Sequence, residues 1–283
     1  MDRRDFLRAS ALVSGAAMIG GSQAVAGQFT GKIKKAVKGH MVIGDMPMDD
    51  KFRLVRDLGF DGIEVRAKLE SKDKQLVRSY AEAREKTELP IHGLIHSNNP
   101  DLIGAIDQAK MLGANSILHV VRYDQSIPYM QNYKETQDII RKAIDHAEKH
   151  GVMLLLENVW ASFLIEPLGM ARYIDELESP MVGSYFDVGN VVRWGWPQHW
   201  IEVLGKRVKK LDIKEYDLKM AMNEGMRKGF SPPLGGGSIQ WEKVRSELAA
   251  IEYEGWATAE VKGGDETRLK EIAEQMDKVL DLI

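Results

Sequence analysis

Acidic side chains that end short apolar segments are the residues of this sequence best suited to chemistry. Glu157, Asp187 and Glu260 each lie at or near the end of such a segment. An ionised carboxylate at the end of a buried strand costs several kcal/mol unless a partner charge or a metal compensates it. A structural salt bridge explains any one of them. Three carboxylates in one place repel one another, and a divalent cation offsets that repulsion most directly.

Asp212 and Lys214 are two residues apart on one predicted strand, so their side chains project to the same side. Asp212 either completes the ligand set or pairs with Lys214, and we expect the ligand role. Carboxylate ligands without a certain imidazole favour a hard cation over Zn²⁺. We expect Mn²⁺, with Mg²⁺ or Co²⁺ as alternatives. The predicted metal ligands are Glu157, Asp187, Asp212 and Glu260.

Further polar and aromatic residues occur at predicted strand ends and in the loops that follow. His96 and His119 end consecutive strands and could reach the site, although a hydrogen-bonded core position explains each equally well. Trp160 and Trp194 lie in loops where an aromatic face suits stacking on a sugar ring, and ordinary packing explains them as well. The predicted substrate contacts are Glu64, His96, His119, Lys214, Trp160 and Trp194.

Short apolar runs alternate with longer amphipathic segments along the chain. The runs predicted as strands are 36–43, 62–65, 91–95, 116–121, 152–156, 182–186, 208–213 and 256–261. The segments predicted as helices are 49–58, 72–86, 100–112, 133–150, 166–177, 198–204, 239–250 and 266–282. Eight strand–helix repeats predict an α/β fold, a single (β/α)8 TIM barrel over residues 27–283. The alternative is an open doubly wound sheet, which usually carries a glycine-rich turn after its first strand.

One long irregular stretch, 215–238, contains Gly235-Gly236-Gly237 and is predicted to be a substrate lid. Overall composition agrees with one globular domain, because 44% of the 283 residues are hydrophobic and 29% are charged. The net charge of −3 gives no electrostatic case for nucleic acid as the main partner. The basic clusters 32–38 and 206–210 are short and interrupted, which indicates solvated faces.

Residues 1–26 have a different character from the rest of the chain. Arg3 and Arg4 precede Phe-Leu, a weakly apolar run follows, and Ala24-Val25-Ala26 resembles a cleavage site. This pattern predicts a twin-arginine signal peptide, export to the periplasm and no membrane attachment after cleavage. A short amphipathic first helix is the alternative. The sequence has no cysteine, which excludes disulfides and lipidation on cysteine.

The motifs resemble those of the xylose isomerase-like TIM barrels, over roughly residues 35–283. The resemblance rests on Gly-Ile-Glu64, Leu-Leu-Glu157-Asn158, Phe-Asp187-Val-Gly-Asn190, Leu-Asp212-Ile-Lys214-Glu215, the Leu234–Trp241 segment and Ala-Glu260. In that family, the carboxylates matching Glu157, Asp187 and Glu260 bind one divalent metal. The chain departs from the family at three positions. Asp212 replaces a histidine ligand, Asn190 replaces another histidine, and Gly236 replaces an acidic residue.

The resemblance implies a metal-dependent sugar isomerase or epimerase, with Glu157 and Glu260 moving a proton beside a metal-bound carbonyl. Export argues against phosphorylated substrates, so a free sugar or keto-sugar is expected as the small-molecule partner. A 3-keto-glycoside lyase would use the same enolate. A non-catalytic sugar-binding barrel is the alternative from another class, motivated by Asp212 and Asn190. Assembly into a homo-oligomer is left open.

Overall fold

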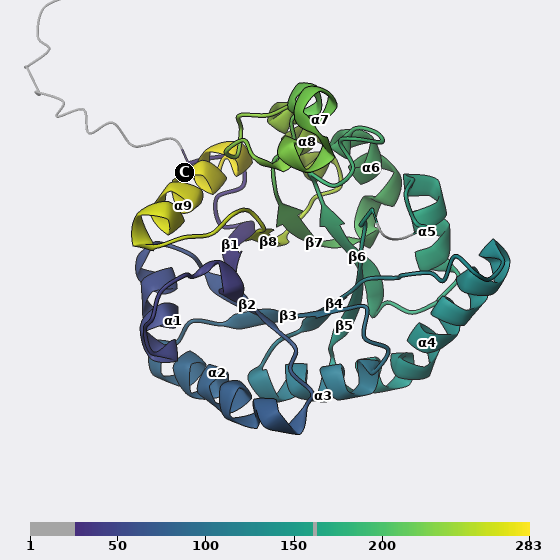
Figure 1. The fold of residues 1–283 in the computed structure, drawn as a ribbon, viewed down its shortest axis with the longest axis horizontal. Coiled ribbons are helices and arrows are strands. Elements are labelled where there is room, and N and C mark those ends of the chain that lie inside the picture. The colour runs from purple at the N-terminus through teal and green to yellow at the C-terminus, as the bar shows by residue number, and fades with distance from the viewer. Residues whose placement is uncertain (1–25, 161–162) are drawn as a thin grey trace, which may run out of the picture.

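Eight parallel strands close into one barrel in the computed structural model, which describes residues 26–160 and 163–283. The predicted signal segment therefore lies almost wholly outside the described residues. Neighbouring strands follow sequence order around the barrel, and the ribbon forms a ring around its axis (Figure 1). The predicted fold class is confirmed. The strands are β1 Ile33–Lys38, β2 Gly62–Arg66, β3 Ile91–Ser97, β4 Ser116–His119, β5 Met153–Glu157, β6 Val182–Asp187, β7 Val208–Ile213 and β8 Gly255–Ala259.

The helices form an outer layer around the barrel (Figure 1). Those described are α1 Met48–Asp57, α2 Lys74–Thr87, α3 Leu102–Leu112, α4 Tyr129–His150, α5 Pro167–Asp175, α6 Pro197–Leu204, α7 Leu218–Glu224, α8 Trp241–Ala250 and α9 Glu266–Leu280. Helix α7 lies within the stretch that was predicted to be irregular. Across residues 26–160 and 163–283, no helix is long and apolar enough to cross a membrane.

Local sequence signals fix several helix ends. The Asp101 carboxylate accepts a hydrogen bond from the backbone N–H of Gly104 at 2.9 Å, which caps the start of α3. Gly113 and Gly151 end α3 and α4 with φ angles of 72° and 65°. This left-handed conformation costs glycine little, because glycine has no Cβ. These ends allow each helix to turn directly into the next strand.

Two apolar regions flank the barrel wall. The larger region lies between the strands and the outer helices and includes residues from nearly every element. The smaller lies inside the barrel on the side of β4 and β5 and consists of Leu118, Val120, Leu155 and Tyr185. The remaining interior is polar, which is unusual because branched aliphatic side chains usually fill such barrels.

A buried hydrogen-bond network occupies that polar interior. The Lys210 ammonium donates to the His92 carbonyl at 2.6 Å and to Asn115 Oδ1 at 2.8 Å. His92 Nε2 lies 3.1 Å from Thr258 Oγ1, which lies 2.8 Å from the Tyr185 hydroxyl. Because buried polar groups without partners are costly, this network allows a lysine to remain inside the barrel.

Lys210 should make the stability of the protein depend on pH. Burial lowers the pKa of Lys210 to about 7, and the nearby Glu64 carboxylate opposes this only partly. Between about pH 7 and the unfolded pKa, the unfolded chain binds a proton that the folded chain lacks, so stability rises with pH. Between pH 7 and 10, the free energy of unfolding of the wild type should rise by a few kcal/mol relative to that of Lys210→Met.

Chemical denaturation of both proteins across this pH range measures the effect. Below pH 7, the difference between their free energies of unfolding should not change with pH. Lys209→Met, which changes the neighbouring and less buried lysine, serves as the control. Parallel stability profiles for the wild type and Lys210→Met would show that the buried amine is not deprotonated on folding.

Candidate active site

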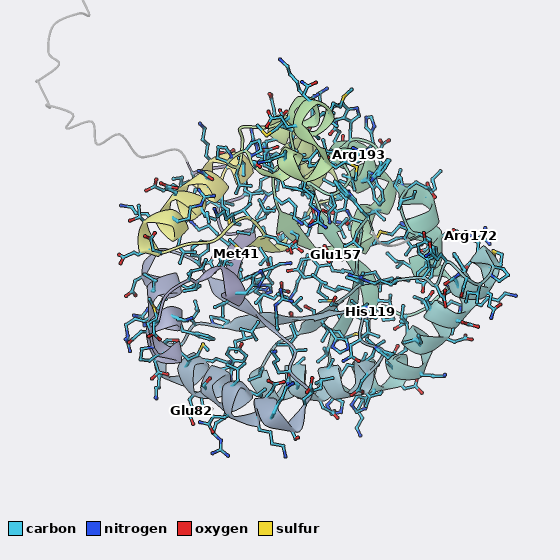
Figure 2. All side chains as sticks on the ribbon, in the orientation of Figure 1. Met41, Glu82, His119, Glu157, Arg172 and Arg193 are labelled. Carbon is cyan, nitrogen blue, oxygen red and sulfur yellow. The ribbon has the colours of Figure 1, made fainter. Side chains whose placement is uncertain are left out.

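The barrel brings the four predicted metal ligands together at one end. Glu157 and Asp187 are the last residues of β5 and β6, Asp212 lies within β7, and Glu260 directly follows β8. Each offers one carboxylate oxygen, and these atoms all lie within 4.8 Å of one another. Figure 2 shows Glu157 near the centre of the ring of helices. The strands are parallel and adjacent, so residues at their carboxyl ends necessarily converge.

Two lysines bridge three of these four carboxylates. Lys38 Nζ lies 2.8 Å from Asp212 Oδ2 and 3.2 Å from Glu260 Oε1. Lys214 Nζ lies 2.8 Å from both Asp187 Oδ2 and Glu260 Oε2. The alternative that Asp212 pairs with Lys214 is therefore wrong. Asp212 pairs with Lys38, and Lys214 pairs with Asp187 and Glu260. Both ammonium groups sit among buried oxygens, so they offset part of the negative charge.

Lys38 is the important residue that sequence reasoning missed. It belongs to the basic cluster 32–38, which was interpreted as a solvated face, yet only 2% of its side chain is exposed. The first strand was predicted at 36–43, but the chain enters a 3-10 turn at Gly39–Met41, so β1 ends at Lys38. Its place within the run predicted as a strand, two residues after Ala36 and so on the same face, was the signal that could have found it.

The lysines and the burial set the protonation of the carboxyl groups. Burial alone would raise the pKa of Glu260, but the Lys38 and Lys214 ammonium groups outweigh it and hold this pKa far below its usual range. Burial, reinforced by the Glu260 charge, raises the pKa of Glu157 to about 8. Burial also raises the pKa of Asp212, despite its contact with Lys38. Glu157 and Glu260 therefore differ strongly in their affinity for a proton.

Asparagines orient the cluster. Asp187 Oδ1 accepts hydrogen bonds from the backbone N–H groups of Gly189 and Asn190 at 2.9 and 2.8 Å. Asn158 pairs with the Asp187 backbone through two hydrogen bonds of 2.8 Å. The Asn190 amide lies 3.4 Å from Glu157 Oε1. Asp187 is thus held by one oxygen while its other oxygen faces Lys214.

A cavity of about 390 Å³ opens above the carboxylates. Glu157, Glu260, Lys38 and Lys214 lie among its lining residues. Trp160 also lines it, as predicted, and its indole N–H donates to the Asn190 carbonyl at 2.6 Å. The volume of this cavity is in the usual range for small-molecule sites.

Three other predicted substrate contacts lie away from this cavity. Ile95 and Leu118 line it, so the alternation of strand side chains turns the buried His96 and His119 to the outer face of the barrel wall. Trp194 is 54% exposed, lies under the Arg193 guanidinium and is not among the lining residues. The expectation that both histidines reach the mouth is wrong, because the strand register was not known from the sequence.

Glu64 lies inside the barrel beneath the cluster and is fully buried. Its Oε2 is 4.0 Å from Lys38 Nζ, and it is not among the cavity's lining residues. The space it occupies depends on Gly93, where an added Cβ would lie only 2.9 Å from Glu64 Oε1. Glu64 therefore supports the position of Lys38, and the prediction of a direct substrate contact receives no support from its placement.

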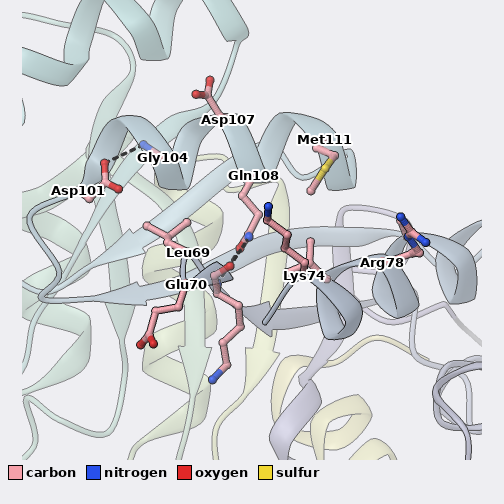
Figure 3. Close-up of a pocket in the computed structure, with 12 residues that line it drawn as sticks. Leu69, Glu70, Lys74, Arg78, Asp101, Gly104, Asp107, Gln108 and Met111 are labelled. Carbon is pink, nitrogen blue, oxygen red and sulfur yellow. Dashed lines mark hydrogen bonds between the residues drawn. The ribbon is translucent and has the colours of Figure 1, made fainter. Parts of the chain in front are cut away.

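A larger cavity of about 620 Å³ lies in the outer layer between α2 and α3 (Figure 3). Its lining combines apolar groups, such as Val77 and Met111, with charged side chains at the edge. None of the four clustered carboxylates borders it. The barrel mouth is therefore the candidate active site.

The family model for xylose isomerase-like TIM barrels matches residues 52–281. That range covers most of the chain and includes all four clustered carboxylates. This chain belongs to the xylose isomerase-like TIM barrel family. The family resemblance inferred from the sequence motifs is confirmed. Among curated proteins, none matches the sequence significantly.

Several solved structures of this fold are similar to the chain. The 3-keto-D-glucoside 4-epimerase of E. coli has a TM-score of 0.71 at 15% identity, covering 88% of this chain and 99% of that chain. A D-allulose 3-epimerase from Methylomonas sp. has a TM-score of 0.71 at 16% identity, covering 88% and 98%. The IOLI protein, solved with a zinc atom, has a TM-score of 0.70 at 17% identity, covering 87% and 98%. At these identities the likeness establishes a shared fold.

The donor set of this family member fits a hard divalent cation. All four clustered groups offer oxygen, which Mg²⁺ and Mn²⁺ prefer. Asp212 Oδ1 is buried and has no hydrogen-bond partner among the described residues. The four carboxyl groups outnumber the two ammonium groups that contact the cluster. Lys214 nevertheless contacts Asp187 Oδ2 and Glu260 Oε2, so the Lys214 ammonium and a metal ion would compete for these two carboxylates.

Removal of the Lys214 ammonium should strengthen metal binding. Lys214→Met leaves the Asp187 and Glu260 oxygens free and makes the site more negative by one charge. We expect Mn²⁺ affinity to rise at least tenfold, or about 1.4 kcal/mol. Isothermal titration of chelator-treated protein with Mn²⁺ measures this change. Lys142→Met, which removes an exposed charge on α4, should leave the affinity unchanged. Equal or weaker Mn²⁺ binding by Lys214→Met would contradict direct competition.

Proposed function

We propose that this chain is a metal-dependent sugar isomerase or epimerase that moves a proton at a carbon beside a carbonyl. One observation carries the proposal: Glu157 and Glu260 line the floor of a cavity and belong to four carboxylates whose oxygens lie within 4.8 Å of one another. The pKa of Glu157 is raised and that of Glu260 is lowered, which agrees with different roles in proton transfer. Pairs of carboxyl groups whose environments separate their pKa values are typical of acid–base sites. The sugar epimerases of the same fold support the substrate class.

The residues divide the chemistry between them. Glu260, kept ionised by two lysines, is the base that removes the proton. Glu157, whose pKa burial raises to about 8, holds a proton more tightly than Glu260 and is the group that returns the proton. Polarisation of the substrate carbonyl and acidification of its neighbouring C–H are what a divalent ion held by Glu157, Asp187, Asp212 and Glu260 would supply. We propose Mn²⁺ as that ion, with Mg²⁺ or Co²⁺ as alternatives.

The walls of the cavity support a sugar as the substrate. Trp160 and Phe230 form an aromatic wall, with ring centroids 5.3 Å apart, and such faces stack well on sugar rings. Arg66 and Arg122 also line the cavity, and neither forms an ion pair with another described residue. We propose a non-phosphorylated sugar or keto-sugar, and the unpaired guanidinium groups favour one that carries a carboxylate.

Solvent exchange tests the proposed proton transfer. Sugar or keto-sugar incubated in D2O with the Mn²⁺-loaded protein should take up deuterium at the carbon beside the carbonyl, detected by NMR. The panel should pair neutral sugars with the matching uronates. Glu157→Gln and Glu260→Gln keep the size of the side chain and remove the base, so each should lower exchange by orders of magnitude.

Metal content must be measured in each variant, because both residues also belong to the proposed ligand set. The matched control is Glu215→Gln, which changes a buried glutamate outside the cavity lining. Label at an inverted centre indicates epimerisation, and label at the neighbouring carbon indicates isomerisation. Release of an aglycone, together with formation of an unsaturated keto-sugar, indicates the alternative function, a 3-keto-glycoside lyase. Sugar binding without any exchange across the panel would instead indicate a non-catalytic sugar-binding barrel.

We further propose that residues 1–26 are a twin-arginine signal removed on export to the periplasm. The packing of the residues that directly follow Ala26 supports a mature chain that begins near Gly27. The Phe29 backbone N–H donates to the Asp281 carbonyl at 3.1 Å, and Phe29 is buried. N-terminal sequencing of periplasmic protein should therefore begin near Gly27. Recovery of periplasmic protein that retains Met1 would exclude cleavage.

A further inference from the structure

A second cluster of metal-ligating side chains lies on the outer helices, away from the cavity. His146 and His150 are one turn apart on α4, with ring centroids 4.4 Å apart. Asp107 on α3 reaches across to them, and its Oδ1 lies 2.6 Å from His146 Nε2. One ligand atom from each residue lies within 4.8 Å of the others. Among the described residues, this cluster and the carboxylates at the barrel mouth are the two that satisfy this criterion.

The spacing explains why the three groups meet. Residues four apart on a helix lie on the same face, so the two imidazoles project together. Helices α3 and α4 are packed neighbours in the outer layer (Figure 1), which brings Asp107 opposite that face. His150 is the last residue of α4 and precedes β5, so it lies toward the end of the barrel opposite Glu157. This cluster is therefore separate from the proposed active site.

The donor set differs in chemistry from the one at the barrel mouth. Two imidazole nitrogens and one carboxylate oxygen suit Zn²⁺, Ni²⁺ or Cu²⁺, whereas four carboxylates suit harder ions. Both histidines are partly exposed, so an ion can reach the ring nitrogens from solvent. Asp107 lies within hydrogen-bonding distance of His146 Nε2, so its carboxylate is already beside a nitrogen that would face the ion.

We propose that Asp107, His146 and His150 form a second metal site, which binds a transition metal of the Zn²⁺ class and links α3 to α4. The ion takes the place of the hydrogen bond between Asp107 and His146 and adds His150 as its third protein ligand. Because the site joins two helices of the outer layer, its role is structural, and turnover at the barrel mouth does not depend on it.

Titration of the chelator-treated full chain with Zn²⁺ tests the proposal, by isothermal titration and by the shift in melting temperature. His150→Ala and His146→Ala should each weaken one equivalent of Zn²⁺ binding at least tenfold and abolish the associated rise in melting temperature. Asp107→Asn, which alters an exposed group and so is least able to disturb folding, should weaken the same equivalent.

Two controls separate this site from the other histidines and from the active site. His199→Ala removes an exposed histidine on α6 and should leave Zn²⁺ binding unchanged. Asp212→Asn alters the barrel mouth and should leave the α3–α4 equivalent intact, whatever becomes of the proposed enzyme activity. Zn²⁺ affinity that is unchanged in both histidine variants would overturn the proposal, as would the absence of any Zn²⁺ equivalent outside the barrel mouth.

Discussion

The contact of two lysines with three of the four clustered carboxylates is the interaction on which the carboxyl-terminal end of this barrel depends. Without Lys38 and Lys214, adjacent strand ends would hold mutually repelling charges in a region of low dielectric constant. The two ammonium groups reach across strands, since Lys38 joins β1 to β7 and β8, and Lys214 joins β7 to β6 and β8. They thereby connect the strands on which the candidate chemistry lies.

The same charge balance separates the roles of the two candidate catalytic groups. Glu260 contacts both lysines and is ionised, while Glu157 is buried beside the Asn190 amide and holds a proton more tightly. The apolar cluster on β4 and β5 excludes water on one side of the interior. The polar network around Lys210 continues the charged half of the barrel toward its other end. The two candidate groups thus differ through their surroundings, not through their residue type.

The sequence predicted what depends on local pattern. Eight apolar runs and the helix-ending glycines, such as Gly113 and Gly151, were enough for the barrel, and parallel topology then brought the four carboxylates together. Predictions from the sequence failed where strand register and side-chain direction determine which residues reach the cavity. His96 turned outward because Ile95 faces the cavity. Lys38 was missed because its basic neighbours indicated a solvated face, although it lies within the run predicted as a strand. Partners on other strands, such as Glu260 for Lys214, carry no signal in local spacing.

The central claim is that the four carboxylates form a divalent-metal site from which Lys214 is displaced. A crystal of the protein soaked in Mn²⁺, measured at the manganese absorption edge, tests it most directly. The account predicts one anomalous peak bounded by oxygens of Glu157, Asp187, Asp212 and Glu260, with Lys214 Nζ moved away from Asp187 and Glu260. No peak at saturating Mn²⁺, with Lys214 still bridging those two carboxylates, would contradict it.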